Sequence, residues 1–132
     1  MTNVQINSAI SVDCVIFGFD GKNLKALLVR RRTADPLYDD GEQKLPGAMI
    51  RENETLPEAA SRVLEGATGL TGLYLKQTSI FSDPDRVDAD ELKWICQYHG
   101  INTDRVVTVG YYALVKLDKG LSLYTSRKGA TW

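Results

Sequence analysis

The chain has 132 residues, of which 43% are hydrophobic, so it can bury the core of one domain and is too short for two. Its 16 basic and 17 acidic residues leave a formal net charge of -1, which gives no electrostatic footprint for nucleic acid or an anionic membrane. The first residues lack the basic and apolar segments of a signal peptide, and no apolar run reaches membrane-spanning length. We therefore expect a cytoplasmic protein without membrane contacts.

Two β-rich segments open the chain. Residues 10–19 and 24–32 are rich in β-branched and apolar side chains, and the Asp-Gly turn signal in residues 20–23 between them predicts a β-hairpin. The basic run at 30–32 is interpreted as a strand end entering solvent rather than as a phosphate site. Cys14 and Cys96 have no metal-ligand spacing and are expected to be buried, reduced thiols.

A helix with marked ends follows an exposed polar loop at residues 33–44 and a short apolar run at 45–50. Thr55 and Glu58 have the spacing of a capping box, and Pro57 lies in the first turn, where its missing N–H costs little. Gly69 is the expected C-terminal stop.

The second half of the chain predicts two more strands, at residues 73–81 and 105–117. Between them, Asp88 and Glu91 have the spacing of a second capping box, and Gly100 is a second helix stop, so a short helix is expected there. Strands on both sides of a central helix predict an α/β (α+β) domain with a mixed sheet and helices packed against it.

The last residues predict a turn at 118–120 and then an extended segment, with the pattern of a strand that is just beginning at 128–132. Either the fold closes with that edge, or the chain is the front part of a longer protein. We favour the second interpretation, because domains rarely end on an uncovered apolar strand.

Residues 45–70 resemble the Nudix box, the loop-helix-loop signature of hydrolases that cleave nucleoside diphosphates linked to another group. In that family a Gly is followed after five residues by a Glu. Seven residues further come Arg-Glu, an aliphatic residue, any residue, Glu-Glu, any residue, Gly and an aliphatic residue. On this pattern Ala48 takes the place of the first Gly, and Glu54 and Arg62 match the Glu and the Arg. The later matches are Leu64, Gly69 and Leu70.

The three helix glutamates of the pattern are missing, because their positions hold Val63, Gly66 and Ala67. The family uses such carboxylates to hold divalent metal ions, which neutralise charge on the phosphoryl groups. Aliphatic side chains and a bare Gly offer no oxygen ligand. The resemblance therefore implies a Nudix-like fold with no metal site and no catalytic residue, in which Glu54 still pairs with Arg62 and pins the loop to the helix.

Two other carboxylates suggest an alternative. Glu58 and Glu65 flank Arg62 at helical spacings, so the three form one stripe. The stripe is either a displaced magnesium (Mg²⁺) site or a solvent-facing ladder of salt bridges. We favour the ladder, because Arg62 would repel a metal cation.

The resemblance extends beyond the box. Residues 79–86 and 104–115 look like the matching segments of ADP-ribose pyrophosphatases and of Nudix-related (NrtR-like) transcriptional regulators, and residues 12–31 are similar to their first hairpin. The regulators combine a Nudix-like domain, often catalytically silent, with a C-terminal DNA-binding domain. The resemblance implies that residues 1–132 are one Nudix-like domain, truncated at its C-terminal end, which senses a small molecule and forms a homodimer. DNA binding would need a C-terminal domain absent from this chain.

The effector pocket is expected over the sheet next to the Nudix helix. Its candidate residues are Met49, Arg62, Phe81, Asp83, Asp85 and Tyr112. Residues 87–102 depart from the family pattern, as an insertion beside the entrance of this expected pocket. Trp94 and Tyr98 share one face of the inserted helix and are expected to be core packing rather than a binding platform. His99 has no partner in sequence that indicates catalysis or metal binding.

Three functions remain open. The first is a catalytically inactive domain of a transcriptional regulator that senses a sugar or nucleotide sugar and needs no cofactor. The second is an active, magnesium-dependent hydrolase of ADP-ribose or a related nucleoside diphosphate, using Glu54, Glu58 and Glu65. The third is an interaction module whose inserted helix is the contact surface. We favour the first.

Overall fold

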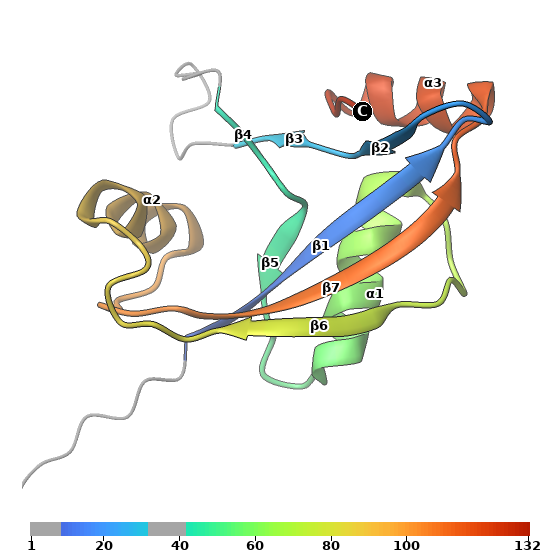
Figure 1. The fold of residues 1–132 in the computed structure, drawn as a ribbon. Coiled ribbons are helices and arrows are strands. Elements are labelled where there is room, and N and C mark those ends of the chain that lie inside the picture. Colours follow the sequence, from blue (N-terminus) through green and yellow to red (C-terminus); the bar gives the residue numbers. More distant parts are fainter. Residues whose placement is uncertain (1–8, 32–41) are drawn as a thin grey trace, which may run out of the picture.

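Two long strands from opposite ends of the chain run side by side through the fold (Figure 1). The computed structural model describes residues 9–31 and 42–132. Its elements, in chain order, are β1 (Ile10–Phe19), β2 (Leu24–Ala26), β3 (Val29–Arg30), β4 (Gln43–Lys44), β5 (Gly47–Met49), α1 (Leu56–Thr68), β6 (Lys76–Phe81), α2 (Ala89–His99), β7 (Val107–Lys116) and α3 (Lys119–Arg127). No helix in these two ranges combines the length and apolar character needed to cross a membrane.

The main sheet is mixed. β1 and β7 are parallel, and β2, β5 and β6 add to them in antiparallel fashion, so that the central order is β2-β1-β7-β6 with β5 also paired to β1. β3 and β4 form a separate two-stranded hairpin. The mixed sheet and the three helices confirm the predicted fold class.

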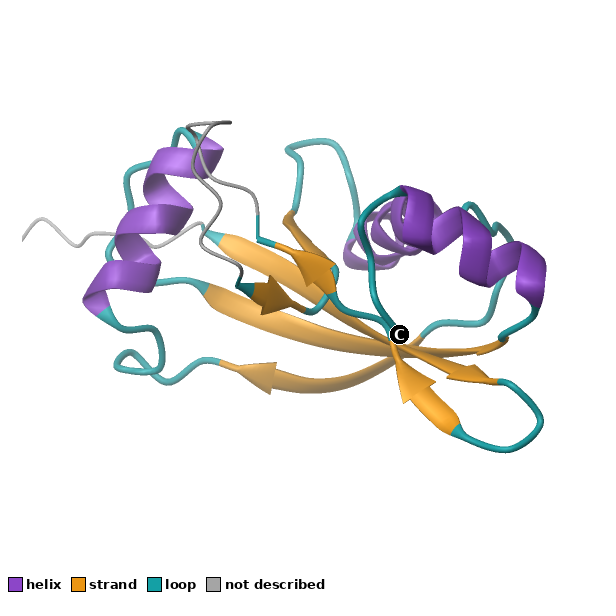
Figure 2. Ribbon diagram, turned by 90° about the horizontal axis from the view of Figure 1, so that it is seen from above, coloured by secondary structure: helices purple, strands orange, loops and turns teal. Residues whose placement is uncertain are grey.

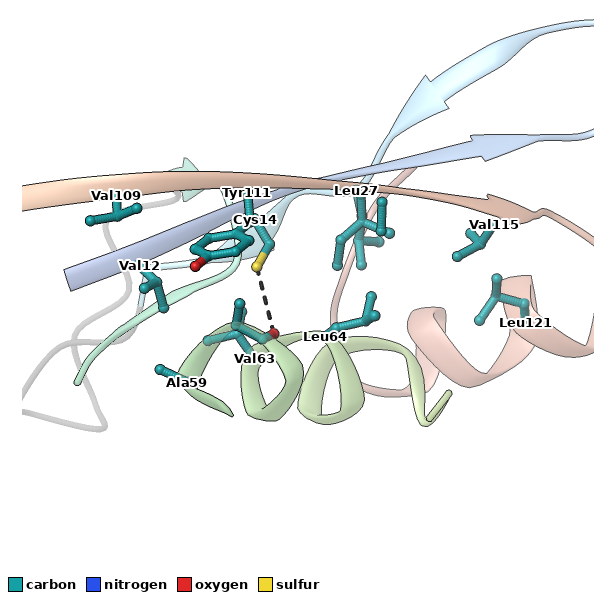
Figure 3. Packing of buried hydrophobic residues seen from close by; sticks show 13 residues of the cluster. Val12, Cys14, Leu27, Ala59, Val63, Leu64, Val109, Tyr111, Val115 and Leu121 are labelled. Carbon is teal, nitrogen blue, oxygen red and sulfur yellow. Dashed lines mark hydrogen bonds between the residues drawn. The ribbon is translucent and has the colours of Figure 1, made fainter. Parts of the chain in front are cut away.

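Side chains alternate between the two faces of β1 and β7. Those on one face point toward α1 and form the core with it (Figure 3). The buried cluster consists of Val12, Cys14, Ile16, Leu27, Ala59, Ala60, Val63, Leu64, Val109, Tyr111, Ala113, Val115 and Leu121. The Sγ–H of Cys14 donates to the Ala60 carbonyl at 3.7 Å, so this free thiol is a core group, as predicted.

The predicted ends of α1 are confirmed. Thr55 is the N-cap, its Oγ1 accepts from the Glu58 N–H at 3.2 Å, and the Glu58 carboxylate accepts from the Thr55 N–H at 3.3 Å. Gly69 follows the helix with φ 73°, a left-handed conformation that favours glycine. The predicted hairpin is also present, with the Asp20 carboxylate accepting two backbone N–H groups across its turn.

The inserted segment forms the predicted helix, α2, which begins after its N-cap Asp88 and ends at Gly100. However, the expectation that its aromatic side chains belong to the core is wrong. No residue of α2 is buried, Trp94 is half-buried, and the side chain of Tyr98 is 41% exposed. The helix lies at the end of the sheet where β1 begins and β6 ends, while α1 and α3 lie together farther along it (Figures 1 and 2).

The end of the chain differs from the expectation. Residues 119–127 form α3 instead of an extended segment, because Asp118 acts as an N-cap for the Leu121 N–H and the helix buries Leu121 and Thr125. Only Thr131 is extended as predicted, and it pairs with Leu28 through hydrogen bonds of 2.7 and 2.8 Å. Most of the predicted loop at 33–44 lies outside the described residues, and its last two residues form β4.

Leu64→Ala should destabilise the fold by about 2–5 kcal/mol, because Leu64 is 2% exposed and its truncation leaves a cavity between α1 and the sheet. Urea unfolding followed by circular dichroism measures the change. The neighbouring exposed substitution Glu65→Ala is the control, expected to stay within about 0.5 kcal/mol of the wild type. Equal effects of the two substitutions would contradict the packing of α1.

Candidate functional site

An ion pair ties the loop before α1 to the helix. The Arg62 guanidinium donates to the two carboxylate oxygens of Glu54 at 2.6 and 3.0 Å, and to the Met49 carbonyl at 3.1 Å. The same carboxylate accepts the Arg51 N–H at 2.9 Å. The predicted pairing of Glu54 with Arg62 is therefore present, and it connects β5, the loop and α1 in one network.

The ion pair shifts the titration of both partners. The hydrogen bond from Arg62, helped by that from the Arg51 N–H, lowers the pKa of Glu54 from 4.5 to about 2. The same hydrogen bond raises the pKa of Arg62 above its ordinary value. Glu54 is thus held as a carboxylate whose oxygens already accept three donors.

The three positions that carry glutamates in the Nudix box have no oxygen ligands here. Val63 is 8% exposed and belongs to the core, and Ala67 is half-buried against it. The Gly66 carbonyl accepts a hydrogen bond from the Lys128 Nζ at 3.0 Å. Two aliphatic side chains and an ammonium group do not fit a divalent cation. Nowhere in residues 9–31 and 42–132 do three or more His, Cys, Asp or Glu side chains gather to hold a metal ion.

The predicted ladder of salt bridges between Glu58, Arg62 and Glu65 is wrong, while the displaced metal site on the same stripe stays an alternative. The Glu58 carboxylate turns to Thr55, accepting from its N–H at 3.3 Å and its hydroxyl at 2.9 Å. Arg62 turns to Glu54 instead. Arg62 pairs with Glu54 rather than Glu58 because a backbone N–H already holds the Glu54 carboxylate beside the guanidinium. The Glu58 carboxylate is instead bound to the N-cap residue.

The face of the sheet away from α1 carries a group of polar side chains that the sequence analysis missed. We call these residues the polar cluster: Ser11, Asp13, Lys44, Arg86 and Thr108. The Ser11 and Thr108 hydroxyls are 2.8 Å apart across β1 and β7. Arg86 donates to the Thr108 hydroxyl at 2.7 Å and to the Val106 carbonyl at 3.1 Å.

Asp13 is the half-buried acid of the polar cluster. Burial raises its pKa, the nearby charges of Lys44 and Arg86 oppose that rise, and Glu91 of α2 adds to it. Burial also lowers the pKa of Lys44, while Asp13 and Glu91 oppose that fall. A Cβ at Gly47 would collide with the Asp13 carboxylate, so only a glycine lets β5 approach this side chain.

The inserted helix α2 closes one side of the polar cluster. The ring of Trp94 lies 4.9 Å from the Arg31 guanidinium carbon and 5.6 Å from the Lys44 Nζ, measured to its centroid. Tyr98 stacks on Trp94, with centroids 5.2 Å apart and an interplanar angle of 9°. His99 has a pKa lowered by burial and by the charge of Lys44. Aromatic and charged groups of α2 therefore belong to the same site as Asp13.

The structure places three of the six residues predicted to bind the ligand on one face of the sheet. Met49 pairs with Ser11, Phe81 with Thr108, and Tyr112 with Val15, which places all three on the face of the polar cluster.

The other three predicted residues lie elsewhere. Arg62 is on α1, on the opposite side of the sheet, where it holds Glu54. Asp83 and Asp85 lie in the loop after β6, where the Asp83 carboxylate accepts the Asp85 N–H at 2.9 Å. A signal for Asp13 was present in the sequence, because a lone charge alternates with apolar residues in 10–19.

This arrangement resembles known structures, although no protein-family model and no curated protein matches the chain. The fold and the loop-helix-loop define a Nudix-like domain. It is similar to Shewanella oneidensis NrtR complexed with a 27mer DNA, with 27% identity over 93% of this chain and 49% of that one, and a TM-score of 0.69. It therefore spans about half the length of NrtR.

Two further structures support the same class. The NUDIX domain of Shewanella oneidensis NrtR complexed with ADP ribose is 28% identical, over 86% of this chain and 64% of that one, with a TM-score of 0.62. A mutT/nudix family protein from Listeria innocua is 25% identical, over 85% and 68% of the two chains, with the same TM-score of 0.62. The chain is thus a Nudix-like domain similar to the part of NrtR that it covers.

Arg62→Met should raise the pKa of Glu54 from about 2 toward 4.5, as measured by NMR titration of the side-chain carboxyl. Because the folded-state pKa is depressed, the pair stabilises the wild type above the unfolded value near 4.5 and loses this effect as the pH falls toward about 2. The variant should lack this part of the acid dependence. Arg127→Met, on α3, is the control and should leave the titration of Glu54 unchanged. An ordinary pKa for Glu54 in the wild type would show that the pair does not form.

Proposed function

We propose that this chain is the effector-sensing part of a transcriptional regulator and that it has no Nudix hydrolase activity. Its effector belongs to the sugars or nucleotide sugars. One observation carries the proposal: the helix face where the Nudix box has metal ligands holds Val63 in the core and the Lys128 ammonium on the Gly66 carbonyl. The fold and its Glu54–Arg62 tie remain, while the oxygen ligands are missing.

The loss of metal ligands bears directly on the chemistry. Hydrolysis of a pyrophosphate develops charge on the phosphoryl oxygens, and metal ions bridging those oxygens neutralise it. A single exposed ammonium does not bridge two phosphates or lower the pKa of a water molecule as a divalent ion does. Glu58 and Glu65 do not replace the missing ligands, since Glu58 is bound to the N-cap. The domain is therefore suited to binding and not to turnover.

The polar cluster supports a ligand that has both hydroxyl groups and negative charge. Lys44 and Arg86 are suited to phosphate or carboxylate oxygens, and the Asp13 carboxylate is suited to sugar hydroxyls. Phe81 and Tyr112 supply aromatic surface on the same face. The NUDIX domain of NrtR has been seen with ADP ribose, which combines these chemical features. We therefore place the effector at the polar cluster rather than on α1.

The proposed regulator would contact DNA through a part of the protein that this chain does not cover. NrtR has been seen with DNA, and this chain spans about half of its length. The net charge of -1 also argues against DNA binding by these residues. We include a homodimer in the proposal, and the exposed edge strand β6 is compatible with contact to a second copy.

Asp13→Asn should weaken binding of ADP-ribose, the probe ligand, by about tenfold to a hundredfold, because a hydrogen bond to a charged group is lost without a change of shape. Isothermal titration calorimetry measures the affinity, and circular dichroism checks the fold. Glu65→Gln, an exposed position on α1, is the matched control and should bind like the wild type. Equal affinity of Asp13→Asn and the wild type would place the effector elsewhere.

The wild-type chain should not hydrolyse ADP-ribose in the presence of magnesium or manganese, and these ions should not strengthen its binding. Chromatographic detection of the products, AMP and ribose 5-phosphate, measures the turnover. Metal-dependent turnover that Glu58→Gln abolishes would overturn the proposal in favour of the hydrolase that uses Glu54, Glu58 and Glu65. Absence of binding across sugars and nucleotides would instead favour an interaction module.

A further inference from the structure

The ring of Trp94 on the inserted helix α2 contacts Lys44 of the polar cluster and the neighbouring Arg31. None of its residues is buried, so its attachment does not come from a hydrophobic core of its own. Trp94 instead packs against two cations of the β3–β4 hairpin, Arg31 and Lys44, while Tyr98 stacks on it within the helix. Segments with few buried apolar side chains open at low free-energy cost.

Arg31 and Lys44 are held together by the backbone of the hairpin. Lys44 pairs with Val29 in β3, and the Arg31 N–H donates to the Glu42 carbonyl at 2.9 Å. Two positive side chains on adjacent strands repel each other, and the electron-rich ring of Trp94 offsets part of that repulsion. A bound anion offsets it more strongly, because charge-assisted hydrogen bonds exceed cation–π contacts between the same groups.

We propose that Trp94 is a displaceable cap on Arg31 and Lys44, and that an anionic ligand enters the polar cluster by taking the place of its ring on these two cations. α2 is then a cover that opens when the ligand binds. This inference rests on the proposed function, which places an effector at the same cluster, and it adds that the inserted helix competes with the effector's anionic group.

The cap has a thermodynamic consequence. When the competent state is only partly populated, the apparent dissociation constant exceeds the intrinsic one by the inverse of that population. Removing the ring takes away this competing contact on both cations. Trp94→Ala should therefore tighten the binding of ADP-ribose by about threefold to tenfold, the range that corresponds to a partly exposed cation–π contact. If Trp94 instead contacted the bound ligand directly, Trp94→Ala would weaken the binding of ADP-ribose.

Two measurements test the cap. Calorimetry compares ADP-ribose and inorganic pyrophosphate binding to the wild type, to Trp94→Ala and to a control, Tyr74→Ala, which removes a 79% exposed aromatic ring before β6. Fluorescence quenching by acrylamide then follows Trp94 in a Trp132→Phe background, where it is the remaining tryptophan of the two in the chain. Circular dichroism verifies that each variant folds.

The proposal expects tighter binding by Trp94→Ala, unchanged binding by Tyr74→Ala, and quenching of Trp94 that increases as ligand is added. If ligand binds while Trp94→Ala binds equally or more weakly, or while Trp94 becomes less accessible, the cap is overturned and the proposed function stands. If only Trp94→Ala binds, the cap is supported. If neither chain binds either probe, the proposed function fails and the cap fails with it.

Discussion

The parallel pairing of β1 with β7 is the constraint on which the rest of the structure depends. It joins residues about a hundred positions apart in register from Ile10 with Val107 to Phe19 with Lys116. Because side chains alternate along each strand, this one pairing decides which side chains of β1 and β7 pack in the core with α1 and which side chains lie on the other face. Val12 and Cys14 thus pack on the helix, while Ser11 meets Thr108 and Asp13 lies on the same face as Ser11.

The two faces then have different chemistry. On the α1 side the ion pair of Glu54 with Arg62 keeps the loop on the helix, although Val63 has joined the core where the Nudix box carries a metal ligand. On the other side Asp13 is half-buried near the cationic side chains of Lys44 and Arg86, which favour its charged form. The residues that tie the loop to the helix are therefore different from those at the positions where the Nudix box carries metal ligands.

The inserted helix α2 connects the segment after β6 to that second face. Its aromatic residues have helical spacing and resemble a core stripe in sequence, yet they remain half-buried or exposed. Trp94 finds its partners on the β3–β4 hairpin rather than in the core. An amphipathic pattern thus identifies the face of a helix that packs against other residues. Which residues it packs against depends on where the flanking loops place the helix in the fold.

Local signals in the sequence determined the hairpin at Asp20, the ends of α1 at Thr55 and Gly69, the ends of α2, and the mixed α/β class, because caps and turns act between residues three or four apart. The pairing of Glu54 with Arg62 also followed from the motif. The tertiary structure alone decided that α3 buries Leu121 instead of forming a strand, and that Asp13, Lys44, Arg86 and Trp94 meet. These residues lie on separate segments, and only long-range strand pairing brings them together.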